Sequence, residues 1–260
     1  MKSYLKFAES VARSAGKIMK KYYHGDKGSD YKGDNTIVTK ADKEINDMLI
    51  AKVGKCFPEH SVDGEEKKFG KSEYVWTCDP VDGTAMYARN LPVSVFSLAL
   101  VVKGEPIVGV VLDPWQNELY SAVKGGGAFR NGKPIHVSDI PLYDKRSVSH
   151  FDMWPRAGFD VWDILKEIGM KSYWTSIGSV THACMCVASG DFTCVLFPGT
   201  KDKYVDIAAA KVIVEEAGGC VTNFYGKEQR YDTDLDGTVV SNGVCHKEVL
   251  RLIKKHAKRL

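Results

Sequence analysis

The feature that most constrains the fold is the hexapeptide Asp-Pro-Val-Asp-Gly-Thr at residues 79–84, which sets two carboxylates three positions apart. A proline disfavours helix at the residue before it, so we expect Asp79 to end an extended run that begins at Tyr74. Gly83 permits a sharp turn, and Thr84 can then open a new segment with unpaired backbone N–H groups. Paired carboxylates beside such donors can hold a divalent cation and a phosphate together. The alternative is an ordinary strand-end turn with an aspartate cap.

Further short motifs surround this hexapeptide in a definite order. They are Val38-Thr39-Lys40-Ala41-Asp42, Gly64-Glu65-Glu66, Asp113-Pro114, Gly125-Gly126-Gly127 with Asn131-Gly132, Gly178-Ser179, and Asp206-Ile207-Ala208-Ala209-Ala210 running into Glu215 to Gly219. In order and spacing the set resembles the inositol monophosphatase family of metal-dependent, lithium-sensitive phosphatases. The resemblance extends from about Ala8 to Asn242. It implies a hydrolase of phosphoric monoesters with mixed α+β and α/β character, folded as the layered α-β-α-β-α sandwich of sugar phosphatases.

The composition limits the classes of protein to which the chain can belong. Its 260 residues, 44% hydrophobic and 27% charged, suit a globular protein of one or two domains. A net charge of +3 calls for no nucleic acid polymer as partner. The longest apolar stretch, Val93 to Val102, is too short to cross a membrane, and the N-terminal segment lacks the apolar block of a signal peptide. Seven scattered cysteines without a C-x-x-C pair indicate reduced thiols. We expect a cytoplasmic protein whose partner is a small phosphorylated metabolite, and the resemblance adds a homodimer.

The pattern of apolar residues divides the chain into two regions. Residues 1–142 are predicted as an α+β region that carries most of the metal ligands. Residues 143–260 are predicted as an α/β region that closes the active-site cleft. The expected helices are residues 3–23, 42–53, 162–168, 179–189, 207–217 and a basic amphipathic one within 247–259. The expected strands are residues 95–102, 107–112, 118–123, 128–130, 147–149, 193–197 and 238–241.

The resemblance also implies a set of functional residues and two or three Mg²⁺ ions as cofactors. Mg²⁺ prefers oxygen ligands, and two such ions can neutralise a phosphate ester and activate water. The implied metal ligands are Glu65, Asp79, the carbonyl of Val81, Asp82 and Asp206, with Asp42 near a third, weaker ion. The implied catalytic residues are Glu65 and Thr84, which would orient and activate the attacking water, and Asp42, which would contact the Thr84 hydroxyl. The implied substrate-binding residues are Asp82, Gly83, Thr84, Gly178, Ser179 and Lys201.

Several of these residues also have a purely structural interpretation. Asp206 precedes Ile-Ala-Ala-Ala and could cap a helix, Glu65 could be a surface charge, and Asp42 could be a first-turn charge of a helix. Gly178 and Ser179 could form a turn and a helix cap beside any role in substrate binding. For Asp206 the complete set of motifs favours the metal ligand.

Departures from the family pattern bear on the substrate. Val205 stands where many relatives have tryptophan, and Ala-Met-Tyr at residues 85–87 replaces Thr-Asn-Phe. Inositol-specific members carry an acid in the segment that matches residues 198–203, whereas here the matching position has none and Lys201 and Lys203 stand nearby. Inositol 1-phosphate is the first expected substrate. The alternatives are fructose 1,6-bisphosphate, a nucleotide 3′,5′-bisphosphate and histidinol phosphate. A non-catalytic metal-binding scaffold is disfavoured, because a decayed enzyme would not need the complete ligand set.

Overall fold

Two β-sheets organise the structure, a computed structural model that describes residues 1–33, 36–152 and 157–260. The larger sheet has eight strands in the order β10-β9-β8-β7-β6-β5-β3-β4. Its strands are β3 (Ser61–Gly64), β4 (Lys68–Phe69), β5 (Tyr74–Asp82), β6 (Val95–Val102), β7 (Glu105–Asp113), β8 (Glu118–Val123), β9 (Ala128–Arg130) and β10 (Lys133–Pro134). β3 pairs with β5 in parallel, and the long central strands pair antiparallel. β6 is apolar almost throughout because helices cover both faces of the sheet at this strand.

The smaller sheet has five strands in the order β13-β11-β14-β16-β15. Its strands are β11 (Val148–Phe151), β13 (Tyr173–Thr175), β14 (Cys194–Phe197), β15 (Cys220–Thr222) and β16 (Thr238–Ser241). β11 lies between β13 and β14 and is parallel to both, whereas β16 is antiparallel to its neighbours. Two further pairs of short strands are β1 (Asp30–Tyr31) with β2 (Ile37–Val38), and β12 (Phe159–Asp160) with β17 (Lys258–Arg259).

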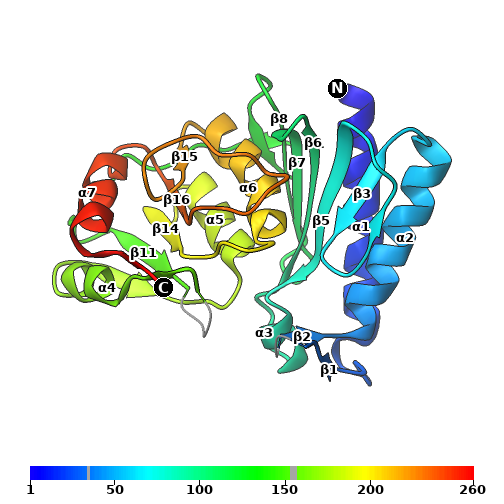
Figure 1. Cartoon of the computed structure of the whole chain (residues 1–260), viewed down its shortest axis with the longest axis horizontal. Helices are drawn as coiled ribbons and strands as arrows, with labels where there is room; N and C mark the ends of the chain where they lie inside the picture. Colours follow the sequence, from blue (N-terminus) through cyan, green and yellow to red (C-terminus); the bar gives the residue numbers. More distant parts are fainter. Residues whose placement is uncertain (34–35, 153–156) are drawn as a thin grey trace.

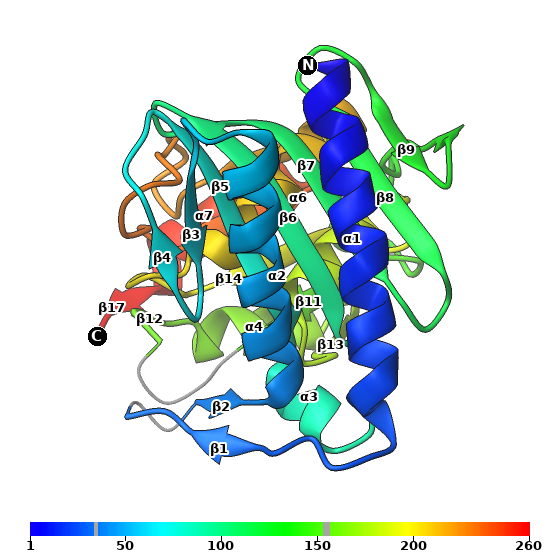
Figure 2. The same ribbon diagram turned by 90° about the vertical axis from the view of Figure 1, so that its right-hand side faces the viewer.

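Helices form the layers on either side of the two sheets. They are α1 (Lys2–Tyr23), α2 (Lys40–Cys56), α3 (Thr84–Ala88), α4 (Trp162–Gly169), α5 (Val180–Ala188), α6 (Tyr204–Glu216) and α7 (His246–His256). Figure 1 shows α1 and α2 on the outer face of the larger sheet, α5 and α6 between the sheets, and α4 and α7 on the outer face of the smaller sheet. In the view turned by 90°, α1 and α2 lie side by side across the strands (Figure 2). This order of layers confirms the expected α-β-α-β-α sandwich.

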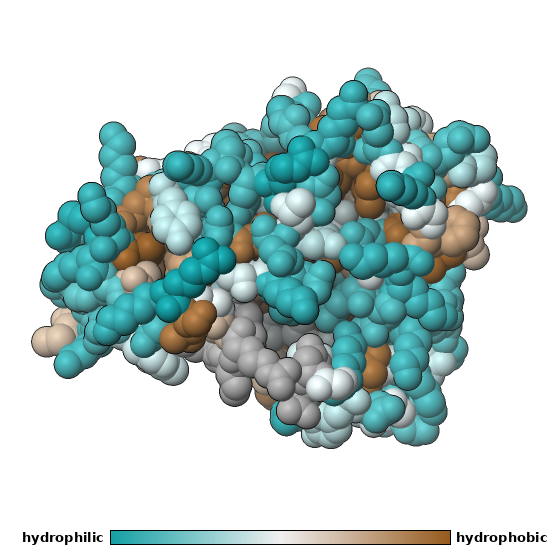
Figure 3. Space-filling view, viewed as in Figure 1, coloured by the Kyte–Doolittle hydropathy of each residue, from teal (hydrophilic) through white to brown (hydrophobic). Residues whose placement is uncertain are grey.

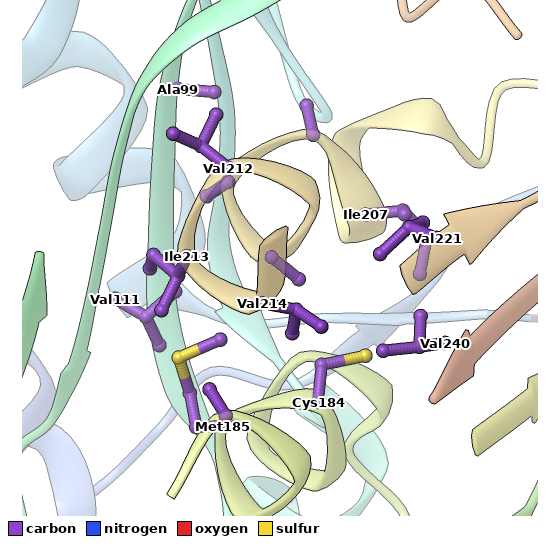
Figure 4. Packing of buried hydrophobic residues seen from close by; sticks show 14 of the residues in the cluster. Ala99, Val111, Cys184, Met185, Ile207, Val212, Ile213, Val214, Val221 and Val240 are labelled. Carbon is purple, nitrogen blue, oxygen red and sulfur yellow. The ribbon is translucent and has the colours of Figure 1, made fainter. Parts of the chain in front are cut away.

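A central apolar core joins the two sheets. Val111 of the larger sheet, Ile213 of α6, Met185 of α5 and Val240 of the smaller sheet belong to one buried cluster. Figure 4 shows these side chains directed toward one another around α5 and α6. Gly109 of β7 permits the close approach of α6, because a Cβ atom there would lie 2.4 Å from the Ala209 carbonyl oxygen. The position of α6 is therefore fixed against both sheets.

Most elements lie where the sequence places them, and two differences matter for function. β6, β8, β9 and β16 have the predicted bounds. β5 does not end at Asp79, as predicted, but continues through Pro80 to Asp82. Its pairing with β6 is irregular between Asp79 and Asp82, so Pro80, which has no N–H to donate, falls where the ladder is already interrupted.

The second difference concerns α6, which begins at Tyr204 rather than at residue 207. Asp206 therefore lies in the first turn of the helix and not at its N-cap, which is Lys203. The predicted boundary between residues 142 and 143 falls in the connection from β10 to β11. It stays a prediction, since α6 packs against strands of both sheets.

The surface is predominantly polar on the face seen in Figure 3, where hydrophobic residues form small separate patches. Among the described residues, none of the helices combines the length and the apolar character that crossing a membrane requires.

Candidate active site

Three aspartates meet at the end of β5 and the start of α6. One carboxylate oxygen from each of Asp79, Asp82 and Asp206 lies within 4.8 Å of the other two, and all three residues are buried. The irregular end of β5 carries Asp79 and Asp82, and the first turn of α6 carries Asp206. The structure thus brings together three of the predicted metal ligands from distant parts of the sequence.

The N-terminus of α5 holds this cluster in place. The Asp82 carboxylate accepts hydrogen bonds from the Ser179 hydroxyl and from the Thr181 backbone N–H, the latter at 2.9 Å. The Thr181 hydroxyl donates to the Asp206 carbonyl oxygen at 2.6 Å. Asp79 accepts from the Val81 N–H at 2.9 Å, which fixes the turn around Pro80. The fold therefore orients one carboxylate oxygen of Asp82 and one of Asp79, and it fixes the backbone of Asp206.

The electrostatics of the cluster favour a bound cation. Burial, with the charge of Asp206 added, raises the pKa of Asp82 to about 8. Burial also raises the pKa of Asp79 well above its usual range, and the charges of Glu65 and Asp82 act in the same direction. Carboxyl groups in this environment resist ionisation until a positive charge neutralises them. Because all the candidate ligand atoms are oxygens, the residues present fit a hard divalent cation such as Mg²⁺.

Thr84 and Asp42 lie beside this cluster. The Thr84 hydroxyl donates to the Val81 carbonyl oxygen at 2.8 Å and lies 3.5 Å from Asp42 Oδ1. Asp42 Oδ2 accepts from the N–H and the hydroxyl of Thr39, at 2.8 and 2.5 Å, and so forms the capping box of α2. Burial raises the pKa of Asp42 to about 7. The structural interpretation of Asp42 as a first-turn residue of α2 is thus confirmed through Oδ2, and its catalytic role through Oδ1 stays a prediction.

Glu65 reaches the same region from β3. Gly64 pairs with Cys78 in the parallel register of β3 and β5, and the Glu65 N–H donates to the Cys78 carbonyl oxygen at 3.0 Å. Glu65 thus follows β3 at the point where β5 reaches Asp79. A Cβ atom at Gly64 would lie 1.9 Å from Oδ1 of the Asn46 side chain, so glycine leaves room here for this side chain of α2.

Lys32 is a charged residue of this region that the sequence did not indicate. Its ammonium lies 3.1 Å from Glu65 Oε1 and 2.6 Å from Glu66 Oε1. It comes from the segment between β1 and β2, whose polar, glycine-bearing sequence carries no signal for such a contact. Glu65 therefore already has one positive partner within the chain.

Gly83 and the Gly178-Ser179 pair lie against each other. Gly83 has a φ of +84°, and a Cβ atom there would lie 2.8 Å from the Gly178 carbonyl oxygen. Ser179 is the N-cap of α5 and accepts from the His182 N–H at 3.3 Å, so the predicted helix cap is confirmed. A role for these residues in substrate binding stays a prediction.

The two lysines that precede α6 differ in their surroundings. Lys201 is exposed, and its predicted contact with substrate stays a prediction. The ammonium of Lys203 lies 3.4 Å from Asp206 Oδ2, with 29% of its side chain exposed. The charge of Asp206 raises the pKa of Lys203, and Glu65 and Asp79 add to the effect. Lys203 therefore belongs to the surroundings of the acidic cluster.

Comparisons with known proteins show which family the chain belongs to. The family model described as "Inositol monophosphatase family" matches residues 1–258. A fructose-1,6-bisphosphatase/inositol-1-monophosphatase of Thermotoga maritima is 33% identical over 86% of this chain and 84% of its own length. A histidinol-phosphatase of Chlorobaculum parvum is 29% identical over 96% of both chains. The solved structure of a Thermotoga maritima IMPase superposes with a TM-score of 0.87 at 30% identity, covering 97% of each chain. The chain therefore belongs to the inositol monophosphatase family.

Proposed function

We propose that this phosphoric monoester hydrolase is Mg²⁺-dependent and that its substrate is inositol 1-phosphate. Membership of the family makes the chain a phosphatase of sugar or polyol phosphates. The ion and the particular ester are the proposal. The observation that supports the ion is the buried cluster of Asp79, Asp82 and Asp206, whose oxygens lie within 4.8 Å of one another, with Glu65 and Thr84 beside it. The choice of ester follows relatives that are named inositol monophosphatase.

The proposed ligand set follows the acidic cluster. Asp79 would be shared by two ions, with Glu65 and the Val81 carbonyl completing the first site and Asp82 and Asp206 the second. Ions bound there would neutralise phosphate charge and lower the pKa of the attacking water. Asp42 is the proposed contact of a third, weaker ion.

Thr84 and Asp42 provide the proposed path for the proton of the attacking water. The Thr84 hydroxyl can accept that proton at Oγ1 while it passes its own proton to Asp42 Oδ1, 3.5 Å away. Because burial raises the pKa of Asp42 to about 7, this carboxylate can take up a proton near neutral pH. Glu65 would orient the water from the other side, and the N–H groups of Gly83 and Thr84 would bind phosphate oxygens.

A specific observation favours a second candidate substrate. Lys203 places a positive charge 3.4 Å from Asp206, in the segment where inositol-specific members are expected to carry an acid. A second phosphate on the substrate would find a charged partner there. The alternative function is therefore hydrolysis of a bisphosphate, such as fructose 1,6-bisphosphate or a nucleotide 3′,5′-bisphosphate.

Phosphate release with Mg²⁺ from a set of esters decides between the candidates. The set comprises inositol 1-phosphate, fructose 1,6-bisphosphate, a nucleotide 3′,5′-bisphosphate and histidinol phosphate. We expect the highest kcat/KM for inositol 1-phosphate. A higher kcat/KM for a bisphosphate would support the second candidate if Lys203→Ala lowers this preference by about tenfold or more. The control is Lys166→Ala on the exposed face of α4, which should leave the preference unchanged. If none of the esters is hydrolysed, both candidates are wrong.

Two further proposals rest on the family alone. We propose that the chain forms a homodimer and acts in the cytoplasm on a small metabolite. Light scattering coupled to size-exclusion chromatography tests the first of these, and a monomer at micromolar concentration would contradict it.

A further inference from the structure

The carboxyl ends of three parallel strands meet at one edge of the smaller sheet. β11 is parallel to both β13 and β14, and Phe151 of β11 pairs with Leu196 of β14. Asp152 directly follows β11 and therefore lies beside the point where β14 leads to α6 and Asp206. Ligands of open α/β sheets bind in the crevice at such an edge. The register thus sets Asp152 at the edge of the sheet that faces the acidic cluster.

The alternation of side chains directs Asp152 toward α5. Phe151 belongs to the outer core beneath α4 and α7. His150, the preceding residue of β11, points to the opposite face, because successive side chains of a strand alternate. Asp152 follows the strand and lies on the same side as His150, since its Oδ2 is 3.0 Å from His150 Nε2. His150 is fully buried there and stacks on Phe192, which packs against the central core. Asp152 consequently faces the layer that contains α5, whose N-terminus holds Asp82.

A hydrogen bond and a close contact fix the Asp152 carboxylate without burying it. The hydrogen bond comes from the Ser176 hydroxyl, which donates to Asp152 Oδ1 at 3.0 Å. His150 Nε2 lies 3.0 Å from Asp152 Oδ2 without the geometry of a hydrogen bond. Ser176 stands two residues before Gly178, in the short segment that leads to Ser179 and its contact with Asp82. With 16% of its side chain exposed, Asp152 keeps lone pairs accessible to a ligand.

Electrostatic coupling agrees with this placement. Burial is the largest cause of the raised pKa of both Asp82 and Asp206, and the negative charge of Asp152 adds to it in each case. Asp152 is thus close enough to these two aspartates for its charge to act on them. Sequence patterns gave no indication of this residue, because it belongs to none of the motifs around the hexapeptide.

We propose that Asp152 is a specificity-determining residue that accepts hydrogen bonds from hydroxyl groups of the polyol part of the substrate. This inference rests on the proposed function. A carboxylate offers acceptors on two oxygens and suits neighbouring hydroxyl groups. It would supply from the end of β11 the acid that the segment 198–203 lacks at its matching position. Esters without hydroxyl groups would leave this acceptor without a partner.

The test compares two esters in the full-length protein with Mg²⁺. Inositol 1-phosphate carries hydroxyl groups, and phenyl phosphate carries none. We expect Asp152→Ala to raise KM for inositol 1-phosphate by about tenfold or more, as loss of a charged hydrogen-bond acceptor does, with little change in kcat. The kcat/KM for phenyl phosphate should stay the same. Asp152→Asn retains an acceptor oxygen and should restore part of the affinity. Asp163→Ala removes an exposed aspartate of α4 and should leave kcat and KM unchanged for both esters.

Other outcomes overturn the inference in distinguishable ways. An equal loss of kcat/KM for both esters in Asp152→Ala would show that Asp152 only supports the fold of the cleft. A lower melting temperature would accompany that loss. Unchanged kinetics for both esters would exclude contact with substrate. If the wild-type protein hydrolyses phenyl phosphate but not inositol 1-phosphate, the proposed substrate is wrong, and the inference falls with it. If it hydrolyses inositol 1-phosphate and Asp152→Ala does not discriminate, the inference alone is wrong.

Discussion

Asp82 is the residue in which the catalytic and structural demands of the site conflict most directly. It is buried beside Asp206 and accepts two hydrogen bonds from the N-terminus of α5. Asp82→Asn keeps the volume and most of this hydrogen bonding but removes one negative charge from a site proposed to hold two dications. We expect most of the activity to be lost while the circular dichroism spectrum is unchanged. Near-normal turnover in a folded variant would show that Asp82 is not a metal ligand.

The same substitution should stabilise the protein when a chelator is present. The pKa of Asp82 is raised to about 8 by burial, so the metal-free folded state holds a proton that the unfolded state has released. The stabilisation that comes from the proton on Asp82 is complete below the ordinary aspartate pKa of about 4, and it is lost as the pH rises through about 8. Asparagine has no such loss. The melting temperature of Asp82→Asn relative to wild type should therefore increase between pH 5 and 8, and a constant difference would contradict this account.

Thr84 tests the chemical step. Its hydroxyl lies between the Val81 carbonyl and Asp42, where it can orient the attacking water. We expect Thr84→Ala to lower kcat by about 10²-fold or more, the range typical of general acid–base assistance, with little change in KM. An increase of KM at constant kcat would assign Thr84 to substrate binding instead.

The residues that the sequence identified and those it missed differ in how they are encoded. Asp79, Asp82 and Thr84 stand within one hexapeptide, so their proximity follows from the chain itself. Lys32 and Asp152 come from segments without a motif. Lys32 contacts Glu65 through an ion pair between distant segments, and the register of β11 with β14 sets Asp152 at the edge of the sheet from which α6 and Asp206 follow. No local pattern predicts such contacts.

Among the elements, α6 links the fold to the site most closely. Gly109 of β7 lies against the backbone of α6 at Ala209, one turn beyond Asp206. Gly109→Ala would force the two backbones apart and should lower the free energy of unfolding by about 1–3 kcal/mol, as overpacked cores do. The displacement should also weaken Mg²⁺ binding, measured by calorimetry. Gly54→Ala is the matched control, since Gly54 lies in α2 with nothing within 4 Å of a new Cβ atom. It should leave Mg²⁺ binding unchanged.

Element boundaries were predictable where a pattern was continuous. β6 and β8 are apolar or alternating runs bounded by polar turns, and their predicted limits are correct. β5 was predicted too short because Pro80 normally ends a strand, whereas here the interruption of the ladder accommodates it. The start of α6 was missed because Tyr204 and Val205 are weak helix formers. Both side chains pack in the central core, and this packing, not helix propensity, determines the first turn.

At the scale of the whole molecule, the site depends on packing between layers. Asp79 and Asp82 come from the larger sheet, Asp206 from a helix between the sheets, and Ser179 from its neighbour. Composition and periodicity indicated mixed α/β structure, but the order of layers came from the family resemblance. Single-sequence patterns do not specify which helix covers which sheet, since many packings bury the same apolar faces.

The most direct test of the central claim, that the aspartate cluster binds the divalent ions of catalysis, is the rate of phosphate release from inositol 1-phosphate after exhaustive chelation. We predict that the chelated wild-type protein is inactive, that Mg²⁺ restores activity in a saturable manner, and that added Li⁺ lowers it. The same titration should leave Asp82→Asn largely inactive. Full activity in the chelated wild-type protein, without added Mg²⁺, would contradict the account.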